Sequence, residues 1–288
     1  MGAVAAMSRS ILIYANCQGE QLQITGRFMA CMAGRFDFKW IPLHLLAESD
    51  WATKYGPDFM ADVVMLWEQV ETGEASRHRT ALYERLPKGC PVVKFPPLSA
   101  TCLWPFAGND PRRAIDPDRY PWPDSIAAAL ATQNLPDDEL FDAYLRITTE
   151  KMPDLNRRLR MDVARWKASD AASDVHMSEW VERTFRSTNL FHTSGHITGP
   201  AIAHLMKQVL SRSAALGASL IRAAAAETDA LLERHAGQDF ESVPIHPLVA
   251  ERLELRFFDP GATYRWHAHA WTFRQYILHY IRWSDYIG

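Results

Sequence analysis

A cysteine flanked by amide side chains near the start of the chain is the first feature that could do chemistry. Cys17 lies between Asn16 and Gln18 and is followed by Gly19, shortly after the apolar run of residues 11–14. An amphipathic helical pattern begins immediately afterwards, so this polar turn joins a buried strand to a helix. Open α/β sheets bind ligands at such turns, where the next helix offers free backbone N–H groups. A cysteine there can have a lowered pKa and act as a nucleophile, whereas the alternative is a small buried hydrophobic residue.

A histidine in a polar loop is the second candidate. The stretch NLFHTSGHITGP covers residues 189–200, and Pro200 is typical of the first turn of a helix. His196 lies just before that helix and could act as a general base, although a loop histidine bonded only to backbone is the alternative. His192 and His196 have the spacing of a zinc pair, but Gly195 argues against a continuous helix and no third ligand is evident. We therefore expect no metal site.

The first hundred residues alternate strands with helices, which is typical of a small parallel sheet. Strands are expected at residues 11–14, 36–42, 62–66 and 92–95, and helices at residues 21–32 and 75–86. Right-handed crossovers would bring the carboxyl ends of all four strands to one edge. That edge would collect the polar side chains Asn16, Cys17, Gln18, His44, Glu68, Gln69 and Ser99.

Other polar groups could support catalysis or bind phosphate. Glu68 could orient a histidine and Gln69 could donate to an oxyanion, although a solvated loop pair is the alternative, more so for Glu68. Arg77 and Arg79 form one short basic cluster and residues 112–113 form another. Each cluster could hold phosphates because a guanidinium binds oxyanions in a bidentate manner, and the alternative is an ordinary solvated face.

The pattern changes after about residue 105. Residues 105–123 are rich in Pro, Asp and Arg, which predicts a loop. Residues 253–258 could form a short strand or an extended arm. The spacing of the C-terminal aromatic residues favours a place in the core over a sugar-binding surface. Helices are expected at residues 124–133, 137–149, 154–168, 178–186, 200–216, 219–235 and 271–286. The fold class is α/β with a sheet of about four strands and a large part that is predominantly helical after residue 124. We expect one compact unit over residues 1–288, with an α/β subdomain at residues 10–104 and a mainly helical part at residues 105–288.

Composition and missing motifs exclude several classes of protein. The 288 residues carry a formal net charge of -3, which provides no overall positive field for nucleic acid. The sequence contains no GxSxG, P-loop or GxGxxG pattern, so α/β-hydrolase, kinase and dinucleotide-binding interpretations lose support. The four cysteines form no CxxC pair, no apolar run approaches a membrane span, and the N-terminus lacks the apolar region of a signal peptide. A reduced, cytoplasmic protein is the simplest interpretation.

Four stretches together resemble the WcbI-type capsular polysaccharide biosynthesis family. They are ANCQGE after the first strand, ADVVMLWEQVE, VVKFPPLSATCLWP and LFHTSGHITGPAIAHL, in this order over roughly residues 10–286. By motif, Asn16, Cys17 and Gln18 match the turn of that family, Gln69 matches a glutamine after a strand, and His196 matches a late histidine. The sequence departs from the family at Gly195, where Asn is common, and at Ile197, where Pro is common, so the loop need not hold the same ligand.

The resemblance implies a fold and an activity. It implies an acyltransferase-like protein with a small α/β region and a large helical one, which binds coenzyme A and acetylates a sugar or nucleotide sugar. The early turn is also similar to that of SGNH-type hydrolases, but Cys17 stands at the nucleophile position and Thr193 stands where the late aspartate is usual.

Three hypotheses follow. In the first, an acyl group moves from acyl-CoA to a sugar hydroxyl. His196 acts as the base, Cys17 carries the acyl group or lines the thioester pocket, and the amides of Asn16, Gln18 and Gln69 stabilise the oxyanion. The start of the following helix, near Gly19, would bind the pyrophosphate of coenzyme A together with arginines such as Arg77 and Arg79. Ser99 lies at the same edge of the sheet and is a further candidate for cofactor binding. The second hypothesis is an SGNH-like esterase on the same site, and the third is a non-catalytic protein that binds a glycan or a protein.

Overall fold

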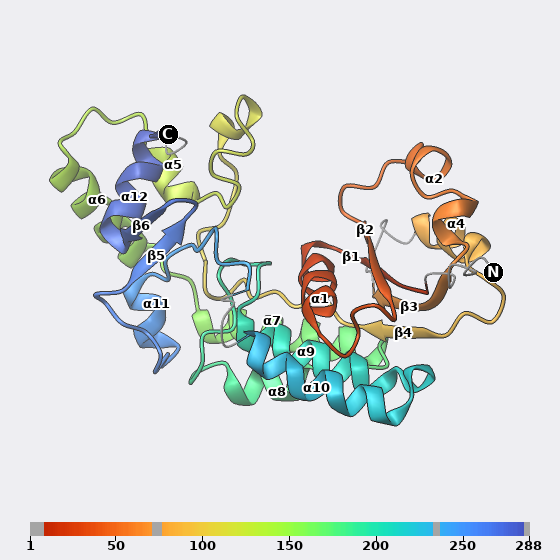
Figure 1. Cartoon of the computed structure of the whole chain (residues 1–288). Coiled ribbons are helices and arrows are strands. Elements are labelled where there is room, and N and C mark those ends of the chain that lie inside the picture. Colours follow the sequence, from red (N-terminus) through yellow and green to blue (C-terminus); the bar gives the residue numbers. More distant parts are fainter. Residues whose placement is uncertain (1–8, 71–76, 233–236, 285–288) are drawn as a thin grey trace, which may run out of the picture. The chain divides into compact units, whose positions relative to one another are not determined.

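The structure, a computed structural model, describes residues 9–70, 77–232 and 237–284 (Figure 1). The chain packs into two compact units, each built from three separated segments. The first unit comprises Met1–Leu98, Trp166–Glu179 and Gly199–Gly237, and the second comprises Ser99–Arg165, Trp180–Thr198 and Gln238–Gly288. Two late helices therefore pack with the N-terminal sheet. The expected organisation as one compact unit with a change after residue 104 stays a prediction.

The first unit contains the predicted parallel sheet of four strands. The strands are β1 (Ser10–Ala15), β2 (Asp37–Pro42), β3 (Val63–Gln69) and β4 (Val92–Phe95), and their order is β2-β1-β3-β4 with every pair parallel. β4 has the predicted bounds, whereas β3 continues three residues beyond its predicted end. Glu68 and Gln69 therefore belong to the strand itself and are not part of a loop.

Helix α1 (Cys17–Phe28) follows β1 directly and starts four residues earlier than the apolar pattern predicts. Asn16 is its N-cap, because the Asn16 side-chain oxygen accepts a hydrogen bond from the backbone N–H of Gln18 at 2.9 Å. The helix lies close to the sheet, since a Cβ atom added at Gly19 would lie 2.5 Å from the Cβ of Ala15. Glycine at this position permits the close approach of helix and strand.

The two faces of the sheet bury alternate residues of each strand. On one face, Phe38 and Trp67 contact each other at 5.8 Å between ring centroids, and the Trp67 indole donates to the Ser213 hydroxyl at 3.0 Å. On the other face, Leu12 and Tyr14 belong to a buried cluster with residues from the segments that follow β2 and β3. The other helices of this unit are α2 (Asp50–Thr53), α3 (Pro57–Met60), α4 (Arg77–Arg85), α9 (Gly199–Arg212), the 3-10 helix η3 (Ala214–Leu216) and α10 (Ala218–Leu232). Residues 75–76, 233–235 and 285–286 of the predicted helices lie outside the described residues.

The second unit is mainly helical, as predicted, but it contains a β-hairpin that the sequence pattern did not indicate. Its elements are the 3-10 helix η2 (Pro111–Ala114), α5 (Ser125–Leu130), α6 (Asp137–Glu150), α11 (Pro247–Arg252), β5 (Thr263–Trp266), β6 (His269–Thr272) and α12 (Phe273–Arg282). The prediction of a helix from residue 271 was wrong at its start, because residues 271–272 pair with β5 before α12 begins. In residues 253–258 the structure has turns and no strand.

Aromatic side chains form the core of this second unit, as the sequence predicted. Tyr120 stacks on Trp266 at 5.4 Å between centroids, and Tyr276 and Tyr280 of α12 pack edge-on against the same tyrosine. All four side chains are buried.

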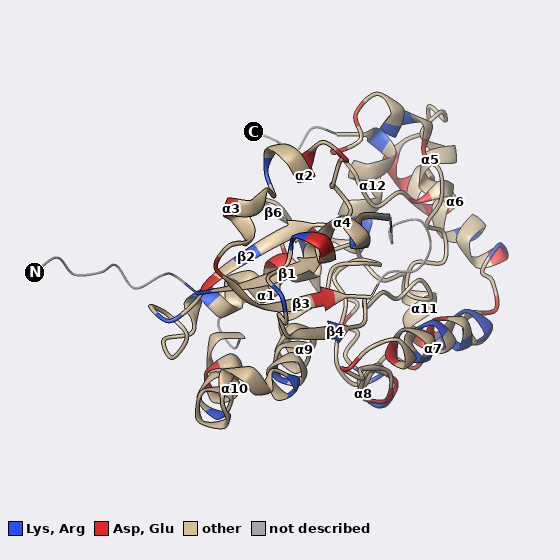
Figure 2. Cartoon of the chain, turned by 90° about the vertical axis from the view of Figure 1, so that its right-hand side faces the viewer, with Lys and Arg blue, Asp and Glu red and all other residues tan. Residues whose placement is uncertain are grey.

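Helices α7 (Leu155–Ala171) and α8 (Ser178–Thr184) each contribute residues to both units. α7 carries both basic and acidic residues (Figure 2). Its Asp162 is buried and accepts hydrogen bonds from the backbone N–H groups of Thr101 and Cys102 at 2.8 Å each. This carboxylate thereby holds the segment that follows β4. No helix in the described ranges is long and apolar enough to span a membrane.

Candidate functional site

A network of buried amides holds the turn after β1. The Gln18 side chain, which is 1% exposed, donates from its amide nitrogen to the carbonyl of Leu98, and its oxygen accepts from the Leu98 N–H at 3.1 Å. These paired bonds join the first turn of α1 to the segment beyond β4, 80 positions later in the chain. Gln18 therefore fixes the geometry of the turn.

Gln69 completes this network from the end of β3. Its side-chain oxygen accepts the backbone N–H of Asn16 at 3.1 Å, and its amide nitrogen donates to the side-chain oxygen of Gln18 at 3.2 Å. Because Gln69 is only 2% exposed, its loss would leave buried polar groups without partners. The structure thus brings Asn16, Gln18 and Gln69 together as the topology predicted. Their action as oxyanion donors stays a prediction.

Cys17 is the first helical residue of α1, directly after the capped Asn16. Its side chain is half-buried, at the carboxyl edge of the sheet. The first turn of a helix carries partial positive charge, which stabilises a negative charge such as a thiolate or an oxyanion. The other cysteines are less suited to react as thiolates. Burial and the carboxylate of Glu227 raise the pKa of Cys31 to about 11, and burial also raises the pKa of Cys90 and Cys102.

The interpretation of Glu68 as a solvated loop residue was wrong. Its carboxylate is fully buried on β3, where it accepts hydrogen bonds from the Arg79 guanidinium and the Tyr83 hydroxyl of α4. Burial, and then the adjacent Glu68 carboxylate, raise the pKa of the Tyr83 hydroxyl, so it remains a donor. Arg79 is thus an ion-pair partner inside the unit, and Arg77 is the first residue of α4. Phosphate binding by either arginine stays a prediction.

His44 follows β2 at the same edge of the sheet. Its ring lies 6.5 Å from that of Trp40, and the Trp40 indole donates to the carbonyl of Ala15, the residue before the turn, at 3.0 Å. Desolvation lowers the pKa of His44 and favours the neutral imidazole. A neutral imidazole can accept a proton. His44, which belongs to the first unit, is therefore a candidate base in addition to His196.

His196 belongs to the second unit, in a loop closed by its own backbone. The N–H of His192 donates to the carbonyl of His196 at 2.9 Å, and the N–H of His196 donates to the Thr193 hydroxyl at 3.0 Å. The buried His196 ring contacts the rings of Trp122, at 4.8 Å between centroids, and Phe240, at 5.5 Å. The sequence did not reveal these two aromatic neighbours, because they come from loops 74 and 44 positions away.

The remaining predicted site residues are placed as follows. Ser99 is half-buried and begins the second unit, and Gly19 lies in the first turn of α1. In the part of the chain that the structure describes, no group of three or more His, Cys, Asp or Glu side chains is placed to hold a metal ion. The leading constellation is therefore a cysteine at the edge of a parallel sheet, positioned by buried amides.

The fold and this turn define an α/β protein with a cysteine at the carboxyl edge of its sheet. The sequence profile of the family described as polysaccharide biosynthesis enzyme WcbI matches residues 10–220. The chain therefore belongs to the WcbI family of polysaccharide biosynthesis enzymes, as its motifs predicted.

A solved structure of WcbI confirms the fold. It superposes with a TM-score of 0.71 and 15% sequence identity over 96% of this chain and 89% of that chain. It is described as a novel polysaccharide biosynthesis enzyme, in a native form without a disulfide bond between coenzyme A and one of its cysteines. No curated protein matches the sequence.

Proposed function

We propose that this protein transfers an acyl group from acyl-CoA to a hydroxyl group of a sugar or nucleotide sugar. The observation that carries the proposal is the position of Cys17 in the first turn of α1, half-buried and bordered by the Asn16, Gln18 and Gln69 network. Buried amides that fix a turn around a cysteine are expected where a thiol or a thioester must be oriented for reaction.

Two features of the related proteins support this proposal. The solved WcbI structure is described by reference to coenzyme A and a cysteine, which is the pair of groups that a thioester reaction at Cys17 would bring together. The family is described by polysaccharide biosynthesis, and a polysaccharide precursor supplies hydroxyl groups as acceptors. An acetyl group is the simplest acyl group for such a donor.

The chemistry divides into two alternatives that use the same residues. In the covalent route the Cys17 thiolate attacks the thioester carbonyl, and the carbon–sulfur bond to coenzyme A breaks. Coenzyme A then leaves as a thiolate that takes up a proton. A sugar hydroxyl next attacks the acyl-cysteine, giving its proton to His196 and releasing the Cys17 thiolate. In the direct route the sugar hydroxyl attacks the thioester itself, with His196 again taking the proton.

The first turn of α1 contributes electrostatically in both routes. Negative charge develops on the carbonyl oxygen in each tetrahedral intermediate, and a donor aimed at it is worth about 3 kcal/mol. The partial positive charge at the start of α1 and the amide nitrogen of Asn16 are what we propose for that role, since the N–H groups of Gln18 and Gly19 are already bonded to Asn16. Gln18 and Gln69 act as positioning residues, because their oxygen atoms already hold the turn.

The test combines calorimetry with intact-protein mass spectrometry. We expect saturable binding of coenzyme A, and after mixing with acetyl-CoA an acetyl adduct that disappears in Cys17→Ala and persists in Cys31→Ala, the matched control. Binding without an adduct would favour the direct route with His196 as base. Absence of coenzyme A binding would favour the esterase or the non-catalytic alternative, and full transfer by both Cys17→Ala and His196→Ala would contradict the proposed roles.

A further inference from the structure

The indole of Trp122 connects a buried carboxyl group to the loop that carries His196. Its Nε1–H donates to Oε2 of Glu241 at 2.8 Å, and its ring packs edge-on against the imidazole of His196 at 4.8 Å between centroids. A Cβ atom added at Gly195 would lie 3.7 Å from Cη2 of Trp122, so the end of the indole opposite Nε1 contacts this loop. One side chain therefore reaches from Glu241 to the residues around the proposed base.

Glu241 is a fixed anchor for this indole. It is 8% exposed, and its backbone forms an isolated antiparallel β-bridge with Trp266. Its second carboxyl oxygen, Oε1, lies 3.6 Å from Nε2 of His267. Burial raises the pKa of Glu241, but a carboxyl group keeps an acceptor oxygen in either protonation state. The bond to Trp122 can therefore persist over the pH range in which a histidine acts as a base.

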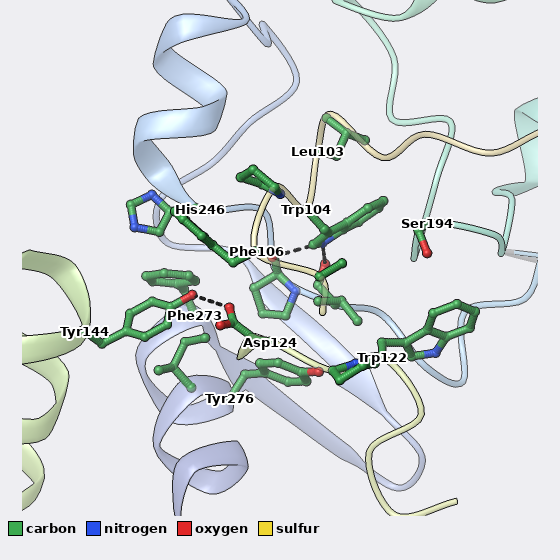
Figure 3. A pocket seen from close by; sticks show the side chains of 16 residues that line it. Leu103, Trp104, Phe106, Trp122, Asp124, Tyr144, Ser194, His246, Phe273 and Tyr276 are labelled. Atoms are coloured by element: carbon green, nitrogen blue, oxygen red, sulfur yellow. Dashed lines mark hydrogen bonds between the residues drawn. The ribbon is translucent and has the colours of Figure 1, made fainter. Parts of the chain in front are cut away.

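A pocket borders the same indole. Trp122 lines this pocket of about 70 Å³, and Ser194, the residue before Gly195, lines it as well (Figure 3). Atoms that face an empty space lack dispersion contacts on that side. Packing alone therefore holds the half-buried indole incompletely, whereas the hydrogen bond to Glu241 fixes the position of its nitrogen.

Phe240, the residue before Glu241, contacts His196 directly. Its ring lies 5.5 Å from the imidazole between centroids. Residues 240 and 241 thus act on His196 in two ways, Phe240 by direct contact and Glu241 through Trp122. Because His196 is 7% exposed, the orientation of its ring depends on the groups packed against it.

We propose that Glu241 and Trp122 are positioning residues for His196. The carboxyl group holds the indole, and the indole holds the imidazole in the orientation in which it takes a proton from the acceptor hydroxyl. Histidine bases are commonly oriented by a third group, often a carboxylate bonded to the imidazole, and here an indole is interposed between the two. This role rests on the proposed function, in which His196 is the base, but the contacts themselves can be tested without turnover.

The first experiment compares the NMR resonances of the His196 ring in matched variants. These resonances report the position of the indole, because its ring current shifts them. We expect Glu241→Leu, which removes the acceptor, to shift them in the same direction as Trp122→Leu. Glu241→Gln keeps an acceptor oxygen and should leave them close to their wild-type values. Adding Glu241→Leu to Trp122→Leu should cause no further shift, because Glu241 acts through the indole.

Ser242→Ala is the matched control. Ser242 follows Glu241, is 7% exposed, and its hydroxyl is hydrogen-bonded to Nδ1 of His192 at 3.0 Å, in the same loop as His196. We expect this substitution to shift the resonances of His192 and to leave those of His196 unchanged. Unchanged His196 resonances in Glu241→Leu would overturn the assignment. So would an equally large His196 shift in Ser242→Ala, because the effect would then be a general one on the loop.

The second experiment measures acyl transfer. We expect Glu241→Leu to lower kcat roughly tenfold to hundredfold, the cost of a misplaced catalytic group, with KM for acyl-CoA within about twofold. Glu241→Gln should restore most of the rate, and Ser242→Ala should retain it. Trp122→Phe removes the indole donor, should lower kcat similarly, and replaces Glu241→Leu if that variant does not fold. A wild-type kcat in Glu241→Leu would overturn the positioning role, whatever its spectrum.

The two experiments separate this role from the proposed function. If the wild type transferred no acyl group, the proposed function would fail, and the spectra would still decide whether Glu241 holds His196 through Trp122. Normal transfer by the wild type with His196 resonances that do not respond to Glu241→Leu would refute the positioning role alone. All spectra are recorded below the melting temperature of each variant, so that unfolding does not mimic a displaced ring.

Discussion

Acid should destabilise this protein through His246, which is the N-cap of α11. Its Nδ1 accepts the N–H of Leu248 at 3.1 Å, so Nε2 carries the proton and donates to the Thr148 hydroxyl at 3.0 Å. The side chain is 6% exposed, and burial lowers its pKa from 6.5 to about 4. The folded protein therefore holds the neutral imidazole at pH values where the unfolded chain is already protonated.

The sign and size of the effect follow from linkage. Between the folded and unfolded pKa values the unfolded state binds more protons, so stability is full above about pH 6.5 and falls as the pH decreases toward about 4. The complete shift corresponds to about 3 kcal/mol, of which about 2 kcal/mol is lost between about pH 7.5 and about pH 5. Relative to a stability of about 5–15 kcal/mol for a domain, this change is easily measured.

The assay is urea unfolding at these two pH values, for the wild type and for His246→Asn. Asparagine keeps an acceptor for the N-cap bond but does not titrate, and it loses the bond to Thr148. We expect the variant to be less stable near neutral pH and to lose about 2 kcal/mol less than the wild type on acidification. Equal acid losses in the two proteins would refute the assignment, because every other titrating group is shared.

Three further predictions concern the turn that carries Cys17. Gly19→Ala should destabilise the protein by about 2 kcal/mol in urea unfolding, since the new Cβ would lie 2.5 Å from that of Ala15. A urea midpoint equal to that of the wild type would contradict this close packing. Gln69→Met should cost about 1–3 kcal/mol and slow acetylation of Cys17, because the turn loses a buried acceptor, and an unchanged acetylation rate would rule out a positioning role. Iodoacetamide at about pH 7.5 should modify Cys17 before Cys31, whose pKa is raised to about 11, and peptide mapping that found the reverse order would contradict this comparison.

The sequence by itself determined the sheet and the identity of the reactive candidates. Short apolar runs bounded by Gly, Pro and polar residues predicted all four strands, and β4 matches its prediction over residues 92–95. The polar turn at Cys17 was evident because a strand pattern stops there and a helical pattern starts. The family motifs at residues 16–18 and at His196 were local as well. All of these signals are read over a few residues of chain.

Capping and hairpin formation were not determined in this way. α1 starts at Cys17 because the Asn16 side chain bonds to the backbone, an interaction that apolar periodicity does not detect. The hairpin of β5 and β6 was missed because its turn contains no glycine, and His267 adopts a positive φ of 52° instead. Trp271 and the residues after it suggested a continuous helix, and only pairing with β5 makes Trp271 part of a strand.

Only the tertiary structure decided how the candidate residues are held. Gln18 meets the backbone of Leu98 across 80 positions, and Gln69 meets Asn16 across 53. Glu68 is buried because α4 supplies Arg79 and Tyr83 as partners. Likewise, only the folded structure shows that the buried Tyr276 hydroxyl has no hydrogen-bond partner among the described residues. Local sequence fixes which groups are present, whereas hydrogen-bond satisfaction depends on groups brought together by folding, which no local pattern encodes.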